Sequence, residues 1–133
     1  MVMLLEVEGK RAEQVREFEK VKAALRELES FGPHSYASLT RQDGSYVQVA
    51  GGKEKCLIVK RDFGDKKHYR ASFAMPETSL GQKQVIECGA GHITVLANEV
   101  FSIEDVVSVW RSFFQGEPFP GSIQWNDMTG VLR

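Results

Sequence analysis

The chain has 133 residues and a net charge of −1; its 42% hydrophobic and 26% charged residues are ordinary for a globular protein and exclude a disordered or fibrous chain. Its length predicts a single domain, residues 1–133, built around one core. No stretch approaches the roughly eighteen consecutive apolar residues that a membrane helix needs, so we expect no membrane partner.

The N-terminal part of the chain predicts a short strand followed by a helix. Residues 3–7 are the candidate strand. Over residues 11–30, apolar side chains recur every three or four positions, which predicts an amphipathic helix. Gly32 and Pro33 end this helix, because glycine accepts a left-handed cap and proline cannot continue the helix. The apolar stripe consists of Val15, Phe18, Val21, Leu25 and Leu28.

The middle of the chain changes to the period of two that is typical of strands. An Asp43-Gly44 turn between two alternating runs predicts a β-hairpin, and a second hairpin turns at residues 62–65. Residues 56–59 are apolar on both faces, which indicates an interior strand covered on each side. The six strands of the predicted meander are residues 36–42, 45–50, 56–59, 67–74, 83–88 and 92–97.

A second helix is expected after residue 102. Ser102 is followed three residues later by Asp105, a capping-box pattern, and Gly116 and Pro118 end the helix. A short β-prone run, residues 122–125, comes next. The predicted fold class is therefore α+β, an antiparallel β-meander of about six strands packed against an N-terminal and a C-terminal helix. The apolar face of the second helix consists of Ile103, Val106, Val107, Trp110, Phe113 and Phe114.

The sequence contains no complete motif for metal binding, dinucleotide binding or nucleophilic catalysis. The histidines, His34, His68 and His92, have no second metal ligand at helical or hairpin spacing. The Gly-Ala-Gly-His run at residues 89–92 lacks the third glycine and the following helix of a dinucleotide fingerprint. There is also no G-x-S-x-G motif around a serine nucleophile. We therefore expect no catalytic, cofactor-binding or metal-binding residues, and a protein that is not an enzyme.

The cysteines and the N-terminus indicate a cellular compartment. Cys56 and Cys88 lie in apolar or β-rich stretches without a C-x-x-C spacing, so we interpret them as reduced core residues. The first residues lack the hydrophobic core and cleavage site of a signal peptide. Both features predict a cytoplasmic location.

Charge is distributed unevenly and leaves two interpretations open. Residues 53–70 contain seven Lys and Arg side chains interleaved with Phe63 and Tyr69, a pattern that could bind nucleic acid. Residues 77–133 instead carry three basic and seven acidic side chains, which oppose the binding of a polyanion. A protein partner is the leading hypothesis, and a nucleic-acid-binding module that uses residues 53–70 is the alternative.

The segment from residue 101 to 125 reads FSIEDVVSVWRSFFQGEPFPGSIQW. It joins a capped amphipathic helix, a double aromatic, a Gly/Pro-bearing turn and a final tryptophan. This ending resembles that of immunity protein family one, the bacterial immunity proteins that accompany deaminase-type polymorphic toxins. Upstream the resemblance extends only to the order of elements, including the turn Asp62-Phe63-Gly64-Asp65. The motif residues, to which we assign a structural role, are Trp110, Phe113, Phe114, Pro118 and Trp125.

The resemblance implies a cytoplasmic antitoxin that binds its cognate toxin domain, a deaminase or nuclease, and blocks the active site without a cofactor. Toxins that act on nucleic acids tend to have basic clefts, so exposed acidic loops would be complementary to them. We expect no direct contact with nucleic acid, and a weak homodimer through an edge strand is left open. The candidate toxin-interface residues are Asp62, Phe63, Asp65, Glu77, Glu87 and Glu99.

Overall fold

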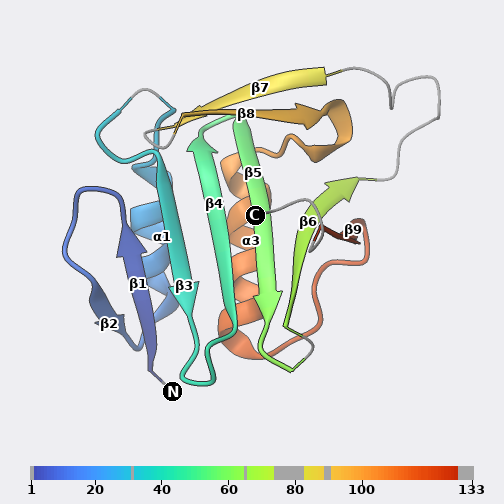
Figure 1. Ribbon diagram of the computed structural model, residues 1–133. Helices are drawn as coiled ribbons and strands as arrows, with labels where there is room; N and C mark the ends of the chain where they lie inside the picture. The colour runs from blue at the N-terminus through green and yellow to red at the C-terminus, as the bar shows by residue number, and fades with distance from the viewer. Residues whose placement is uncertain (1, 31, 65, 74–82, 89–90, 129–133) are drawn as a thin grey trace.

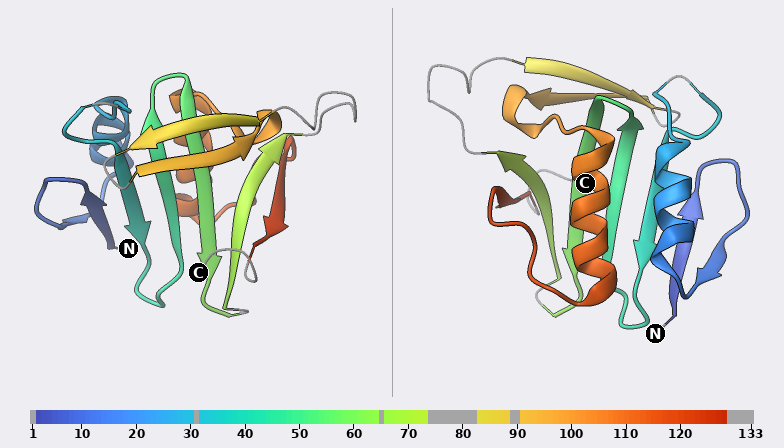
Figure 2. Two further views of the ribbon diagram at one scale, coloured as in Figure 1. Left: turned by 45° about the horizontal axis from the view of Figure 1, so that its top comes forward. Right: turned by 180° about the vertical axis from the view of Figure 1, so that it is seen from behind.

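The computed structural model describes residues 2–30, 32–64, 66–73, 83–88 and 91–128 (Figure 1). Within these residues, two α-helices cover one face of a seven-stranded antiparallel sheet, and a two-stranded ribbon crosses the other face (Figure 2). The predicted α+β class, with an antiparallel meander against two helices, is confirmed. Within the described residues, no helix has the length and apolar character needed to cross a membrane.

The large sheet has the strand order β2-β1-β3-β4-β5-β6-β9, and each neighbouring pair is antiparallel. Strands β3 to β6 form the predicted meander, in which consecutive strands are neighbours. The Asp43-Gly44 hairpin is present, with Thr40 opposite Tyr46 and Gly44 at a φ of 95°. The strands are β1 (Met3–Val7), β2 (Glu13–Val15), β3 (Tyr36–Thr40), β4 (Tyr46–Gly52), β5 (Lys55–Asp62), β6 (Lys67–Phe73) and β9 (Ile123–Asp127).

The first helix is shorter than the sequence predicts. Helix α1 spans Phe18–Arg26 instead of residues 11–30, and residues 13–15 form the edge strand β2. Val15 faces the core from β2, opposite Met3. The expectation of one continuous helix was wrong because the apolar spacing of Val15 also suits a strand that turns its side chain inward. All five residues of the predicted apolar stripe are nevertheless buried.

The second helix begins and ends where its sequence signals lie. Helix α3 spans Ile103–Gln115 and is capped by Ser102, whose hydroxyl accepts from the Asp105 N–H at 3.3 Å. Asp105 in turn accepts from the Ser102 N–H at 3.1 Å, which completes a capping box. Gly116 ends the helix with a φ of 70°, in the left-handed region that glycine adopts without strain.

The last two strands of the predicted six-stranded meander form a separate ribbon, so this part of the prediction was wrong. Strands β7 (Lys83–Cys88) and β8 (Gly91–Leu96) pair with each other but do not join the large sheet. The ribbon instead lies across the face of the sheet that is opposite the helices (Figure 2). Its apolar side, with Ile86 and Val95, packs on Leu57 in a second hydrophobic cluster. A hairpin that buries one face can pack on a sheet as well as extend it, and its alternation does not distinguish the two.

The central strand β5 connects the two clusters. Cys56 and Ile58 are fully buried against the helices, whereas Leu57 faces the ribbon. The expectation that residues 56–59 are covered on both faces is therefore confirmed for this strand. Burial raises the pKa of the Cys56 thiol to about 12, so this thiol stays protonated; both cysteines are free.

Candidate functional site

The candidate site lies on the sheet face opposite the two helices. We call it the uncovered sheet face, because neither of these helices packs on it and the ribbon crosses only part of it (Figure 2). Side chains alternate along each strand, so one residue in two of β1, β3, β4, β5, β6 and β9 faces away from the helices. The strand register aligns six such residues in a row across the sheet. This row consists of Glu6, Ser38, Gln48, Val59, Arg70 and Asn126.

A groove of about 740 Å³ runs over this face, and we call it the central groove. Tyr36, Tyr46 and Gln48 are among its lining residues on the sheet, and Cys88 and Ile93 line it from the ribbon. Tyr36 is exposed, and the Tyr46 hydroxyl lies 3.4 Å from Nδ1 of His68. The groove therefore offers aromatic surface with polar groups between, on rigid strands.

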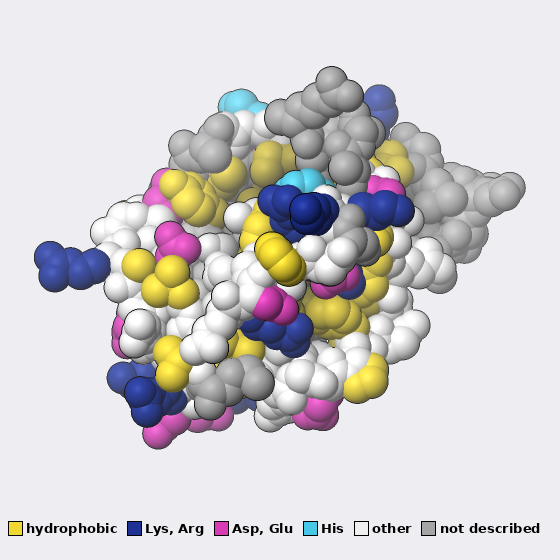
Figure 3. All heavy atoms as spheres, turned by 60° about the horizontal axis from the view of Figure 1, so that its bottom comes forward, with side chains coloured by type: hydrophobic (Ala, Val, Ile, Leu, Met, Phe, Trp, Pro, Cys, Tyr) yellow, Lys and Arg dark blue, Asp and Glu magenta, His cyan; other side chains and the backbone are white. Residues whose placement is uncertain are grey.

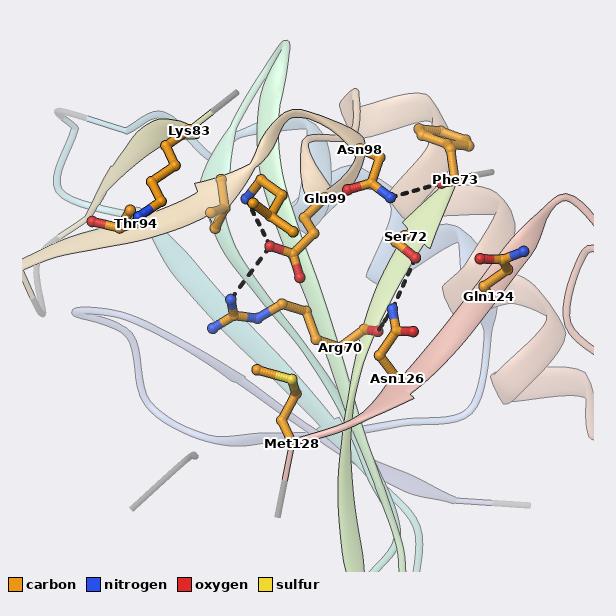
Figure 4. Close-up of a pocket in the computed structure, with 12 residues that line it drawn as sticks. Arg70, Ser72, Phe73, Lys83, Thr94, Asn98, Glu99, Gln124, Asn126 and Met128 are labelled. Atoms are coloured by element: carbon orange, nitrogen blue, oxygen red, sulfur yellow. Dashed lines mark hydrogen bonds and ion pairs between the residues drawn. The ribbon is translucent and has the colours of Figure 1, made fainter. Parts of the chain in front are cut away.

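A second hollow, of about 680 Å³, lies between the ribbon and strands β6 and β9, and we call it the side pocket (Figure 4). Lys83 and Thr94 line it from the ribbon, and Gln124, Asn126 and Met128 line it from β9 and the residue after it. Arg70 lines both the central groove and the side pocket. The guanidinium of this one residue thus lies where the two hollows meet.

Arg70 forms a buried ion pair with Glu99. Its Nη1 lies 3.5 Å from Oε1 of Glu99, and the two side chains are only 11% and 8% exposed. The same Oε1 accepts a shorter hydrogen bond, 2.8 Å, from the Leu96 N–H. Glu99 ends a short 3-10 turn, η1 (Ala97–Glu99), and this turn directs its carboxylate inward (Figure 4).

Asn98, the residue before Glu99, attaches the 3-10 turn to strand β6. Asn98 is 8% exposed and donates from Nδ2 to the Phe73 carbonyl at 3.0 Å. On the other side of β6, Asn126 donates from Nδ2 to the Ser72 hydroxyl at 2.8 Å. Two buried polar atoms of the side pocket, Arg70 Nε and Asn98 Oδ1, have no hydrogen-bond partner among the described residues. Two tryptophan nitrogens of the scaffold, Trp110 Nε1 and Trp125 Nε1, share this property, so the pocket is selected by its position and charge and not by these atoms alone.

The four predicted toxin-interface residues that the structure describes do not come together. Asp62 and Phe63 lie at the turn between β5 and β6, at the end of the sheet away from the ribbon (Figure 1). Phe63 is 55% exposed, and Asp62 accepts from Lys60 Nζ at 3.0 Å. Glu87 lies on the ribbon and faces His92 at 3.2 Å. Asp65 and Glu77 lie outside the described residues.

Glu99 was expected to be an exposed acidic residue, and this expectation was wrong. Its side chain is buried and ion-paired, so it presents no carboxylate to solvent. The sequence places it just before a helix, where charged residues are usually solvated. A 3-10 turn, η1, lies at this point instead, and from it the Glu99 side chain extends toward Arg70.

The aromatic motif residues belong to the scaffold in this structure. Trp110 and Phe113 are buried, and Phe114 packs on Phe18 of α1 with ring centroids 5.7 Å apart. Pro118 is exposed. Trp125 is half-buried and packs on Phe119 at 4.9 Å.

The basic side chains of residues 53–70 do not form one surface. Lys53 donates to the Arg26 carbonyl at the helix side, Lys60 lies under Trp125, and Lys67 pairs with Asp127. In Figure 3, Lys and Arg side chains occur in several separate groups with acidic and hydrophobic side chains between them. The alternating strand geometry therefore divides this stretch between both faces of the sheet.

Comparisons with known proteins identify no relative: no protein-family model, curated protein or solved structure matches the chain. Within the described residues, no group of three or more His, Cys, Asp or Glu side chains could hold a metal ion. Arg70 is not among the site residues predicted from the sequence. The signal was present in the alternation of residues 67–74, which places His68, Arg70 and Ser72 on one face.

Proposed function

We propose that this chain is a cytoplasmic immunity protein that binds a cognate toxin domain through the uncovered sheet face and blocks the toxin's active site. The observation that carries the proposal is the pair of adjoining hollows on that face, which share Arg70. The resemblance of residues 101–125 to immunity protein family one supplies the class of partner.

The composition of this face supports a protein partner. Tyr and Arg are enriched among the residues that dominate binding energy, and Tyr36, Tyr46 and Arg70 all line the central groove. The strands also hold these side chains in place, so little conformational entropy is lost on binding.

Inhibition then requires no chemistry from this chain. A toxin loop or cleft rim that docks against the central groove would be covered by the ribbon on one side and by the sheet below. Occlusion of the active site follows from surface contact alone. The role of helices α1 and α3 is to support the sheet from behind, through the main hydrophobic cluster.

Co-expression with the protein encoded next to this chain tests the proposal. The neighbour should be toxic alone and harmless when the wild-type chain is present. Gln48 is exposed at the middle of the uncovered face, so Gln48→Arg should abolish protection and complex formation in calorimetry. Ser108, exposed on the outer side of α3, gives the matched control: Ser108→Arg should protect fully.

Two results would contradict the proposal. One is a neighbour that is not toxic, and the other is full protection by Gln48→Arg. Binding of a labelled oligonucleotide tests the alternative function. Salt-sensitive binding of that oligonucleotide, lost when basic residues of 53–70 are replaced, would favour the nucleic-acid-binding module instead.

A further inference from the structure

We propose that Arg70 is the anchoring residue of this surface and that it binds the carboxylate of an Asp or Glu side chain of the partner in the side pocket. The inference rests on the proposed function and specifies its contact chemistry. It also reverses the expected polarity, because the anchor of this chain is a cation and the matching group on the partner is an anion.

The first argument is the shortage of acceptors around the guanidinium. Arginine carries five N–H donors in a fixed, planar arrangement. Among the described residues, the only hydrogen-bond or ion-pair partner of the Arg70 guanidinium is Glu99 at 3.5 Å, the long limit for a hydrogen bond. Its Nε is buried without a partner. A nearly buried guanidinium with so few bonds is short of acceptors that a ligand could supply.

Glu99 satisfies only part of the guanidinium. Its Oε1 is shared between Arg70 Nη1 and the Leu96 N–H, and the bond to the Leu96 N–H is the shorter one, at 2.8 Å. The turn that carries Glu99 is attached to β6 through Asn98 and the Phe73 carbonyl. The second terminal nitrogen of Arg70 points away from Glu99 (Figure 4).

The second argument is charge. The described lining of the side pocket carries two cations, Arg70 and Lys83, and one anion, Glu99. A single additional carboxylate would balance this set. Figure 4 shows the Arg70 side chain extending across the pocket below the ribbon, on which Thr94 and Lys83 lie. A carboxylate entering from solvent would meet a planar donor group suited to bidentate binding, in a pocket whose lining carries a second cation.

The third argument is access. The side pocket is open and measures about 680 Å³, ample room for an acidic side chain. Because Arg70 also lines the central groove, a partner loop in the groove can place its carboxylate on the guanidinium without leaving the sheet face. Arginine at the centre of an interface, once fully desolvated, is a common hot spot.

The test uses the isolated, ¹⁵N-labelled chain and two small probes whose α-carboxyl group is blocked as an amide. They are N-acetylglutamate α-amide, whose one charged group is the side-chain carboxylate, and its neutral counterpart N-acetylglutamine α-amide. We expect the glutamate probe to shift the Nε–H signal of Arg70 and the amide signals of Ser72 and Asn98, with saturation. The glutamine probe should shift them at least about fivefold less at the same concentration, because charge-assisted bonds are roughly twice as strong as neutral ones.

Arg70→Lys is the test variant, because it keeps a cation opposite Glu99 and so preserves the fold while losing the planar donor group. It should weaken binding of the N-acetylglutamate α-amide at least about fivefold. Arg61→Lys is the matched control: Arg61 lies on the neighbouring strand β5 but lines neither hollow, so its variant should bind like the wild type.

Three outcomes of the titration would overturn the inference. They are an absence of shifts in the side pocket, equal shifts with both probes, and equal losses in the two variants. The titration uses the chain alone, so it can fail while co-expression still shows protection, and the two proposals are distinguishable. If the probe binds but Arg70→Lys protects against the toxin as fully as the wild type, Arg70 is not the anchor.

Discussion

Removal of Glu99 should be among the most damaging single changes outside the hydrophobic core. Glu99→Ala leaves Arg70, 11% exposed, without a counterion and leaves the Leu96 N–H without its acceptor. Two unit charges 3.5 Å apart attract each other by about 5 kcal/mol at an effective dielectric constant of about 20. Loss of one member of a buried pair typically costs about 3–5 kcal/mol, and we expect the variant to lose that much stability.

Urea denaturation followed by tryptophan fluorescence measures this loss. Glu99→Gln keeps an acceptor for the Leu96 N–H but removes the charge, so it should cost less than Glu99→Ala. Glu104, in an exposed ion pair with Arg26 at 3.3 Å, is the control, and Glu104→Ala should cost less than about 1 kcal/mol. The double change Arg70→Met, Glu99→Leu should recover most of the loss, because it buries no unpaired charge. Equal unfolding midpoints for Glu99→Ala and Glu104→Ala would refute the reasoning.

Three further predictions concern the scaffold. Gly52→Ala should destabilise the chain strongly, since a Cβ there would collide with the Leu28 carbonyl oxygen, and thermal melts of this variant against wild type check it. Trp110→Ala should cost about 3–5 kcal/mol because the ring is fully buried, whereas Trp125→Ala should cost only about 2 kcal/mol in urea, because Trp125 is half-exposed. The Asp43 carboxylate accepts a hydrogen bond from the backbone N–H two residues further on, and this bond lowers its pKa. Its contribution to the free energy of unfolding is therefore present above the pKa of the unfolded state and is lost as the pH falls through the lowered pKa of the folded state. The urea midpoint of Asp43→Ala should therefore lie below that of wild type at neutral pH and converge with it in acid.

The elements that were predicted well are those whose signals are local. The capping box of Ser102 and Asp105, the left-handed Gly116 and the Asp43-Gly44 turn each depend on residues within a few positions, and each is present. The edge strand β2 was missed because Val15 fits a helical stripe and a strand equally well. The helix prediction extended through residues whose pairing with β1 is a tertiary contact.

The site was harder to predict than the fold, because it depends on which residues distant in the sequence become neighbours. Arg70 and Glu99 are 29 positions apart and meet only because the ribbon crosses the sheet instead of extending it. An acidic residue before a helix is normally exposed, and the sequence contains no sign of the turn that buries Glu99. The alternation along residues 67–74 did place Arg70 on a polar face, but the same pattern also describes an ordinary solvated strand.

The C-terminal motif supports one wall of the side pocket. Lys60 Nζ lies about 5 Å from the ring centroids of Tyr69, Phe119 and Trp125, so the aromatic tail closes over a nearly buried cation on the helix side of the sheet. This closure holds β9 against β6, with Trp125 opposite Ala71. The next residue of β9, Asn126, then faces the other side and forms a wall of the pocket around Arg70. The segment that carries the family resemblance therefore supports the surface to which we assign the partner, although none of its rings needs to touch that partner.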